Sequence, residues 1–274
     1  MYSRVYVEIT NICNMQCSFC HGHSRKPRRM TAEEFSHILS ELSSETSYIY
    51  YHLMGEPLTH PDLPLFLQMA HNRGFRSVIT TNGTLLDKRK TELLSLPIYK
   101  INLSVHSFEE GRDEAFFRYL SEISDFADAA SSQGTIVVFR LWNRGFDEGR
   151  NEAILSFLQE RFLGDWAENT RGVRIRDKLH IEWGERFDWP DCEADEGDEE
   201  IFCYALRDHF GILSDGSVVP CCLDSDGRLF LGNIFDTPLS GILSSSRAEA
   251  IREGFARRCA VEDLCRRCGY ARRF

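Results

Sequence analysis

Three cysteines near the N-terminus constrain this chain more than any other feature. Cys13, Cys17 and Cys20 follow a C-x3-C-x2-C spacing within one short stretch. A loop of this kind can place its thiolates on three corners of a cubane iron-sulfur cluster, which leaves the fourth iron without a protein ligand. Because a purely electron-carrying cluster normally has four cysteine ligands, an open iron predicts a place where a small molecule binds. A zinc site with one ligand missing and buried thiols without a role are the alternatives.

The position of the triplet favours the cluster over both alternatives. Between residues 5 and 10, the apolar Val5, Val7 and Ile9 alternate with more polar residues, which is the period-two pattern of a strand. The cysteine loop therefore begins at the C-terminal end of a strand. Parallel β/α barrels place their active sites at that end.

Length and composition indicate a globular chain with a substantial core. The 274 residues suffice for one or two domains, and 42% of them are hydrophobic. No run approaches about eighteen uninterrupted apolar residues, and no charged and apolar leader precedes the first strand, so we expect a cytoplasmic protein without a membrane segment. Ten cysteines in such a chain favour metal binding over disulfides. The net charge of -10 argues against a large nucleic-acid footprint.

The middle of the chain alternates strands with helices. Thr31 and Glu34 form a capping-box pattern, and Phe35, Ile38 and Leu39 then fall on one helical face together with Leu42. Further helices are expected over 61–72, 87–94, 110–131 and 152–162, and strands over 48–53, 75–80, 98–104, 135–141 and 179–183. With the first strand this gives six β/α units. We therefore predict an α/β fold, a partial (β/α)6 TIM-like barrel that is open on one side.

A second group of cysteines lies near the C-terminus. Asp215-Gly216 predicts a hairpin between the runs 210–213 and 217–220. Cys203 and Cys221 flank this hairpin, and the pair Cys265-x2-Cys268 follows from a distant helix. The residues alone leave zinc and an iron-sulfur cluster open as the bound metal. Three cysteines remain outside this set, of which the first two are possible substitute ligands: Cys222, Cys259 and Cys192.

In its first cysteine motif the chain resembles the radical S-adenosylmethionine (SAM) superfamily. The superfamily signature is this spacing after the first strand, with an aromatic residue before the last cysteine, and Phe19 matches that residue near SAM. In the family the open iron chelates the amino and carboxylate groups of SAM, and the reduced cluster cleaves the sulfonium to a 5′-deoxyadenosyl radical. The resemblance implies a [4Fe-4S] cluster on Cys13, Cys17 and Cys20, with SAM as a bound cofactor and a flavodoxin- or ferredoxin-type protein as reductant.

The resemblance also implies a SAM contact after the second strand. Met54-Gly55-Glu56-Pro57 is similar to the Gly-Gly-Glu-Pro loop of the family, with Met54 in place of the first glycine. In the family, backbone carbonyls and the acidic residue of this loop bind the SAM amino group. A carboxylate suits an ammonium donor because the hydrogen bond is charge-assisted. The implied SAM contacts here are Gly55 and Glu56.

Polar residues at the ends of the next strands complete the implied SAM site. Ser104 and Asn102 correspond to positions that contact the ribose. Arg140 corresponds to an arginine that pairs with the SAM carboxylate, for which its planar fork is suited. His106 is a candidate for substrate contact or proton transfer, and loop packing is the alternative.

The C-terminal cysteines resemble the SPASM/twitch extension of radical SAM enzymes. Cys203, twelve residues, Gly216, four residues and Cys221 match the opening of that extension, as does Val219-Pro-Cys-Cys222. The extension carries auxiliary [4Fe-4S] clusters. The resemblance implies the shorter twitch form, a β-hairpin plus a helix with one auxiliary cluster, whose ligands would be Cys203, Cys221, Cys265 and Cys268. We expect a barrel over 1–185, an acidic linker over 186–202 and a twitch-like domain over 203–274.

The resemblance implies an enzyme that abstracts hydrogen from a small molecule such as a cyclitol, sugar or nucleoside. Relatives of the shortened form include a dehydrogenase of an aminocyclitol. An oxidation with the auxiliary cluster as electron acceptor is therefore the leading expectation. A redox-neutral epimerisation or elimination, the radical modification of a short peptide or protein, and a non-catalytic cysteine-rich redox module are the alternatives.

Overall fold

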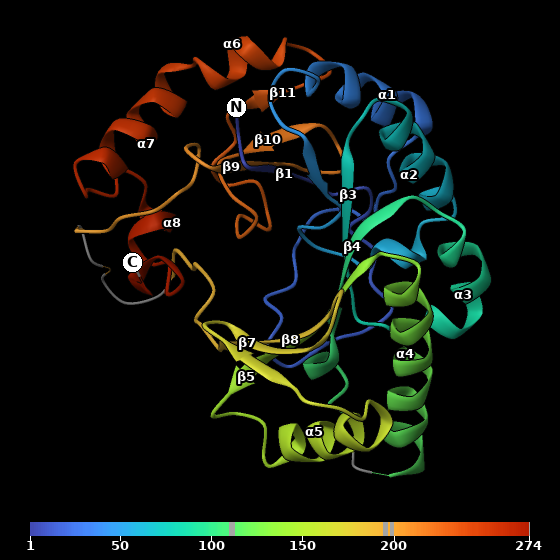
Figure 1. The fold of residues 1–274 in the computed structure, drawn as a ribbon. Coiled ribbons are helices and arrows are strands. Elements are labelled where there is room, and N and C mark those ends of the chain that lie inside the picture. Colours follow the sequence, from blue (N-terminus) through green and yellow to red (C-terminus); the bar gives the residue numbers. More distant parts are fainter. Residues whose placement is uncertain (110–112, 194–196, 198–199, 274) are drawn as a thin grey trace. The chain divides into compact units, whose positions relative to one another are not determined.

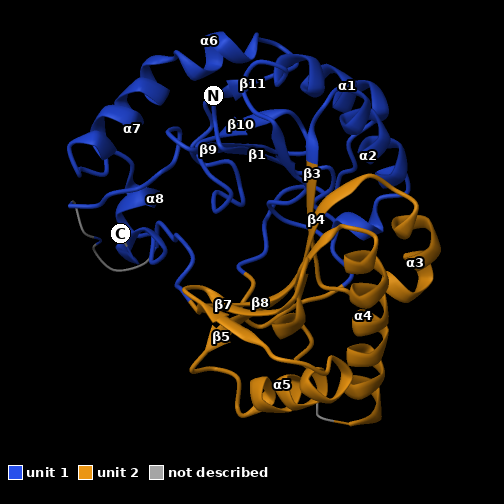
Figure 2. Cartoon of the chain, viewed as in Figure 1, with its two compact units in different colours: residues 1–14, 21–76, 187–274 blue, residues 15–20, 77–186 orange. Residues whose placement is uncertain are grey.

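The computed structural model describes residues 1–109, 113–193, 197 and 200–273. The chain divides into two compact units (Figures 1 and 2). The first unit comprises residues 1–14, 21–76 and 187–274, and the second comprises residues 15–20 and 77–186. No helix within the described ranges is long and apolar enough to cross a membrane.

The sheet of the first unit combines both ends of the chain. Its elements are β1 (Arg4–Val7), α1 (Ala32–Glu41), β2 (Tyr48–Tyr50), η1 (Pro57–Thr59), α2 (Leu63–Asn72), β9 (His209–Ile212), β10 (Ser217–Val219), β11 (Gly232–Asn233), α6 (Leu239–Leu243), α7 (Ser246–Ala256), α8 (Asp263–Arg266) and η3 (Ala271–Arg273). The strand order is β11-β10-β9-β1-β2. The first strand pairs in parallel with both β2 and β9, while β10 runs antiparallel to β9.

The predicted first helix and its apolar face are confirmed. Thr31 and Glu34 form both hydrogen bonds of the capping box at the start of α1. Phe35 is fully buried and stacks on Phe66 of α2 with 4.5 Å between ring centroids. Burial of one such side chain contributes about 1.5–3 kcal/mol, so this contact helps to fix both helices against the core.

The predicted hairpin near the C-terminus is confirmed, and its position adds a finding. Asp215 accepts a hydrogen bond from the backbone N–H of Ser217 at 3.1 Å, and Gly216 has a φ of +86°, which favours glycine. The hairpin consists of β9 and β10, and β9 lies beside β1. The C-terminal cysteines therefore flank a hairpin that belongs to the same sheet as the first strand.

The second unit contains the expected parallel strands and a hairpin that was not expected. Its elements are β3 (Arg76–Thr81, apart from its first residue), α3 (Leu86–Leu94), β4 (Ile98–Ser104), η2 (Val105–Ser107), α4 (Glu114–Ser132), β5 (Ile136–Arg144), α5 (Arg150–Arg161), β6 (Ala167–Asn169), β7 (Gly172–Arg176) and β8 (Leu179–Glu185). The order is β3-β4-β5-β8-β7-β6. The pairs β3–β4, β4–β5 and β5–β8 are parallel, whereas β7 runs antiparallel to both β8 and β6.

The α/β fold class is confirmed, with small differences from the expected boundaries. The helix expected over 110–131 is described over 114–132, and residues 110–112 lie outside the described residues, as do 194–196 and 198–199 of the acidic segment. The compact units do not divide the chain at 185 and 203, because β9 joins the sheet of the first unit. The domain boundaries therefore stay a prediction.

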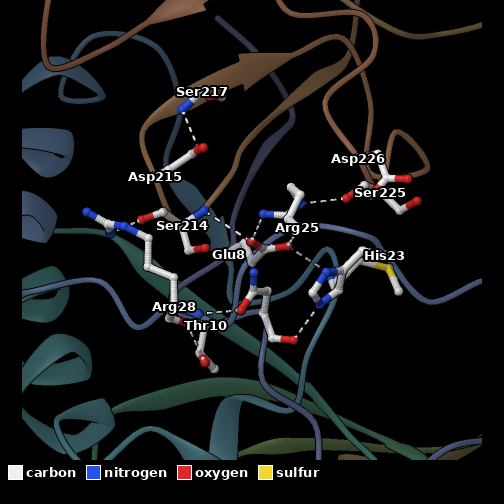
Figure 3. A network of polar contacts seen from close by, with 12 residues as sticks. Glu8, Thr10, His23, Arg25, Arg28, Ser214, Asp215, Ser217, Ser225 and Asp226 are labelled. Carbon is white, nitrogen blue, oxygen red and sulfur yellow. Dashed lines mark hydrogen bonds and ion pairs between the residues drawn. The ribbon is translucent and has the colours of Figure 1, made fainter.

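A buried carboxylate connects distant parts of the first unit. Glu8 follows β1, is fully buried, and accepts two hydrogen bonds from the Arg25 guanidinium, at 2.7 and 2.6 Å (Figure 3). It also accepts from the backbone N–H of Met54 at 3.2 Å and of Ser214 at 3.1 Å. Four donors satisfy this one charge, which a buried carboxylate requires. The contact joins the segment after the cysteine triplet to the loop after β2 and to the β9–β10 turn.

We predict that Glu8→Gln lowers the free energy of unfolding by about 3–5 kcal/mol, because Arg25 is then buried without its counter-ion. Urea denaturation of the anaerobically purified chain, followed by far-ultraviolet circular dichroism, measures the change. Glu253→Gln is the matched control: it breaks an ion pair with Arg257 whose side chains are 71% and 72% exposed, and should cost less than about 1 kcal/mol. Equal, small losses in both variants would contradict the structural role of Glu8.

Candidate functional site

The second half of the cysteine loop lies against the residues that follow β4. The backbone N–H of Ser18 donates to Glu109 at 2.5 Å, and the Ser18 hydroxyl donates to the same carboxylate. The thiol of Cys17 donates to the Ser107 carbonyl with 3.7 Å between sulfur and oxygen. Because Ser18 stands between two predicted cluster ligands, Glu109 holds the backbone that presents them.

The aromatic residue of the motif packs on the predicted histidine. Phe19 lies with its ring centroid 4.9 Å from that of His106. The Nδ1 of His106 donates to the Arg140 carbonyl at 3.0 Å, and burial lowers the pKa of His106 to about 4. The ring is therefore neutral near pH 7, which favours loop packing over a role as general acid. A substrate contact for His106 stays a prediction.

The segment after the triplet is held by the first unit. Asn11 brackets this segment: its Nδ2 donates to the Lys26 carbonyl at 2.9 Å and its Oδ1 accepts from Arg28 N–H at 2.7 Å. Arg25 Nε donates to the Ser225 carbonyl at 2.8 Å, in addition to its bonds with Glu8 (Figure 3). The backbone on both sides of the triplet is thus fixed by side-chain hydrogen bonds.

The Gly55-Glu56 loop approaches the backbone ahead of Cys13. Gly55 has a φ of +75°, and a Cβ there would lie 2.3 Å from the Thr10 carbonyl oxygen, so only glycine fits. Glu56 N–H donates to the Ile12 carbonyl at 2.9 Å. The Glu56 carboxylate is 2% exposed and accepts from Leu58 N–H at 3.0 Å, which caps η1. Its contact with SAM stays a prediction, and the cap is a role that sequence reasoning missed.

Two of the polar residues expected near the site form one row with Glu182 across the second unit. Ser104 is in register with Arg140, and Arg140 is in register with Glu182, so the three lie on neighbouring strands β4, β5 and β8. The Arg140 Nε lies 3.8 Å from a carboxylate oxygen of Glu182, and its guanidinium lies 4.6 Å from the Trp142 ring centroid. The row presents a hydroxyl at the end of β4, a cation within β5 and an anion within β8.

Asn102 lies on β4, two residues before Ser104. Its Nδ2 donates to the Thr80 hydroxyl at 3.1 Å. Its Oδ1 is buried and has no hydrogen-bond partner among the described residues. An unsatisfied buried acceptor is costly in a native protein. Asn102 therefore suits a donor from a bound ligand, such as the ribose hydroxyl that the sequence predicts for it.

The four C-terminal cysteines predicted as ligands lie together. Cys203 precedes β9, Cys221 follows β10, Cys265 lies in α8 and Cys268 follows it. Burial raises the pKa of Cys221, and the negative charges of the other three thiolates raise it further, as does that of Cys222. Burial likewise raises the pKa of Cys203 to about 11. Four convergent thiols are a donor set that fits an iron-sulfur cluster, and ligation would displace their protons.

The two cysteine groups differ in exposure. Cys13 and Cys20 are exposed and Cys17 is partly buried, whereas Cys268 is buried and the other predicted ligands of its group are partly buried. Within the described residues, no three His, Cys, Asp or Glu side chains converge closely enough to hold a single metal ion. A cubane separates its ligands more widely than one ion does, so this finding does not bear on a cluster. Cys259, a possible substitute ligand, is exposed.

Sequence reasoning missed the supporting residues Glu8, Arg25 and Glu109. The position of Glu8 was one indication, because a carboxylate that directly follows a buried strand needs a partner for its charge. Arg25 and Glu109 lie in loops, where neither periodicity nor spacing marks a residue as a partner of a distant side chain.

Comparisons with known proteins agree with both halves of the geometry. The family model of the radical SAM superfamily matches residues 7–142, and that of the SPASM iron-sulfur cluster-binding domain matches residues 203–269. A probable GTP 3′,8-cyclase of Methanothermobacter marburgensis is 31% identical over 302 aligned positions, which cover 96% of this chain and 94% of that protein. The AdoMet-dependent heme synthase of Methanosarcina barkeri is 33% identical over 127 residues, 42% of this chain and 36% of that protein. The chain spans about a third of the length of the first curated relatives it matches.

Two solved structures share the fold. BtrN, crystallised with AdoMet and 2-DOIA, has a TM-score of 0.61 at 19% identity, covering 98% of this chain and 93% of that one. Native anSMEcpe with bound AdoMet has a TM-score of 0.64 at 14% identity, covering 97% and 88%. The matched domains bind SAM on one [4Fe-4S] cluster and carry an auxiliary iron-sulfur cluster. This chain belongs to the radical SAM superfamily and carries a SPASM-type iron-sulfur cluster-binding domain.

Proposed function

We propose that this protein oxidises a small molecule, a cyclitol, sugar or nucleoside, by abstracting one hydrogen atom and passing the remaining electron to the auxiliary cluster. The convergence of Cys203, Cys221, Cys265 and Cys268 carries the proposal. Four thiolates leave no iron vacant for substrate, which suits electron transfer rather than Lewis-acid chemistry. When bound, the first cluster and SAM supply the 5′-deoxyadenosyl radical.

The chain's own residues bind and orient the SAM molecule. Cys13, Cys17 and Cys20 would hold the first cluster, with Glu109 fixing the backbone at Ser18. Glu56 and the Gly55 carbonyl would accept hydrogen bonds from the amino group. These groups lie next to the backbone that leads into Cys13.

The polar row of the second unit would take the rest of SAM. Arg140, which lies 3.8 Å from Glu182, would donate to the carboxylate, for which its planar guanidinium is suited. Ser104 and the unsatisfied Oδ1 of Asn102 would contact the ribose, and Phe19 would pack beside SAM. Ser104 ends β4, and the C-terminal ends of parallel strands are where barrels of this kind bind ligands.

A small-molecule substrate is supported by the relatives of similar length. The chain covers 93% of BtrN, whose crystals contain 2-DOIA. A relative of which the match covers 94% is named for GTP, a nucleotide. A cytoplasmic reductant of the flavodoxin or ferredoxin type would provide the first electron.

A second candidate is the radical modification of a short peptide. The structural match to anSMEcpe, which has also been crystallised with AdoMet and a peptide, favours it. The names of other relatives, a cyclase and a nucleotide dehydratase, keep redox-neutral chemistry as a further alternative. A non-catalytic redox module is disfavoured, since it would not require the SAM-binding row.

We expect Cys265→Ala to retain about half of the roughly eight irons that two cubanes contain. The variant should still form 5′-deoxyadenosine but should fail to release oxidised product, because the electron acceptor is lost. Iron analysis with mass spectrometry of anaerobic turnover mixtures measures both. Cys192→Ala is the control, since Cys192 is outside the predicted ligand set. A wild-type product of unchanged mass, or lighter by water, would refute the dehydrogenation.

Glu56→Gln and Arg140→Gln should each weaken SAM binding at least about tenfold at unchanged iron content. One charge-assisted hydrogen bond is worth about 1.5–3 kcal/mol, and glutamine at 56 keeps the oxygen that caps η1. Equilibrium dialysis with labelled SAM under anaerobic conditions gives the affinity. Glu160→Gln, an exposed position on α5, should leave it unchanged. Wild-type affinity in either test variant would remove that residue from the SAM site.

Glu109→Ala should accelerate iron loss from the first cluster, because the backbone at Ser18 loses its acceptor. The rate of iron release to a chelator, followed by the bleaching of cluster absorbance, measures this in a Cys265→Ala background. Glu160→Ala serves as the control for a general loss of charge. Identical release rates in the two variants would show that Glu109 does not position the loop.

A further inference from the structure

A polar and aromatic face lies on the sheet of the first unit, next to the cysteines that are predicted to bind the auxiliary cluster. Arg4 is in register with His209, and Tyr6 is in register with Tyr50, so the four side chains lie on one face of β1, β2 and β9. The Arg4 guanidinium lies 5.9 Å from the Tyr6 ring centroid and 5.8 Å from that of Tyr50. Tyr6 also makes edge contacts with both Tyr50 and His209.

This face reaches the auxiliary cysteines through Cys222. Cys222 packs against a group of buried hydrophobic residues that contains Tyr6 and Val219. The Tyr6 hydroxyl donates a hydrogen bond to the Cys222 sulfur. Cys222 directly follows the predicted ligand Cys221. Arg4 acts electrostatically on Cys222 and on Tyr270, and Tyr270 in turn lies within the field of Cys203. The arginine therefore lies at the edge of the thiol group.

Arg4 has no anionic partner of its own. Among the described residues, none of the ion pairs between basic and acidic side chains includes Arg4. Its Nε is buried and has no acceptor. Its neighbour His209 adds no charge near pH 7, because burial and the Arg4 cation lower the pKa of His209 to about 4. A guanidinium always carries its charge, so a position like this one needs a negative group nearby.

We propose that Arg4 is the counter-charge of the auxiliary cluster and raises its reduction potential. Four thiolates outweigh the positive charge of an iron-sulfide core, so the bound cluster is net negative, and each added electron makes it more so. A fixed cation close by stabilises the reduced form more than the oxidised form, and net charge is a known control of cluster potentials.

The consequence for function rests on the proposed dehydrogenation. The substrate radical would lose one electron to the oxidised auxiliary cluster and one proton to water, so that the product has two hydrogens fewer than the substrate. A higher potential makes the cluster a stronger acceptor for that electron. Arg4 would thus act on the reaction through the cluster, as a positioning charge that does not touch the substrate.

The test is the midpoint potential of the auxiliary cluster. It is measured by electron paramagnetic resonance during redox titration of the full chain, in a Cys13→Ala/Cys17→Ala/Cys20→Ala background where only the auxiliary cluster contributes. Arg4→Gln should lower the potential, by at least the equivalent of tenfold in the equilibrium for electron uptake, which is about 59 mV for one electron. Arg4→Lys should restore most of the difference, because it keeps the charge.

Two further variants complete the design. Arg76→Gln removes an arginine that also lies over a tyrosine ring, 5.4 Å from the Tyr48 centroid, and should leave the potential unchanged. His209→Glu places a carboxylate in register with Arg4 and should lower the potential without removing the arginine. If Arg4→Gln does not fold, His209→Glu tests whether charge at this position controls the reduction potential of the auxiliary cluster.

An unchanged potential in Arg4→Gln, or in His209→Glu if the first variant does not fold, would overturn the proposal. A raised KM for substrate at unchanged potential would also overturn it, and would make Arg4 an anion subsite instead. The potential is measured without substrate, so its result is independent of the proposed reaction. A redox-neutral product together with a lowered potential in Arg4→Gln would refute the dehydrogenation and leave the role of Arg4 intact.

Discussion

The buried Glu8 carboxylate is the contact on which the cofactor-binding half of the first unit depends. One side chain at the end of β1 accepts from Arg25, from Met54 N–H and from Ser214 N–H. Removal of a charge from water costs free energy. The hydrogen bonds offset this cost only when every acceptor position of the carboxylate is satisfied. The arrangement therefore specifies one geometry for three loops. These are the segment after the cysteine triplet, the Met54–Glu56 loop and the β9–β10 turn.

Exposure separates the two cysteine groups in a way that suits their proposed roles. The first group has two exposed cysteines, which is appropriate where SAM must reach an open iron. The second group lies among partners that desolvate it, and Tyr6, Arg4 and Cys222 border it. Burial and nearby charge control the reduction potential of an iron-sulfur cluster. This environment would therefore set the reduction potential of the auxiliary cluster.

Local patterns in the sequence predicted much of the fold, while the metal-binding residues stay a prediction. The capping box of Thr31 and Glu34 and the Asp215-Gly216 turn follow from short-range chemistry, and both are present. The convergence of Cys203 and Cys221 with Cys265 and Cys268 followed from family resemblance rather than from spacing alone. The β6–β7 hairpin was missed because β6 is an exposed strand of three residues, Ala-Glu-Asn, with low strand propensity.

Long-range pairings were not accessible in the same way. Nothing in the hairpin sequence indicates that β9 pairs with β1, and the paired residues Arg4 and His209 are 205 positions apart in the chain. For the same reason the partners of Glu8, Glu109 and Arg4 were not foreseen. Each depends on which loops or strands the fold places side by side, and a single sequence does not state this.

We infer that the chain cleaves SAM reductively on the cluster of its first cysteine triplet. Formation of 5′-deoxyadenosine by the anaerobically reconstituted protein with SAM and dithionite, quantified by liquid chromatography and mass spectrometry, tests this inference. We expect 5′-deoxyadenosine from the iron-loaded protein and none when Cys13, Cys17 and Cys20 are all replaced by alanine. The inference is wrong if the iron-loaded wild-type protein binds SAM and forms no 5′-deoxyadenosine, or if the triple variant still forms it.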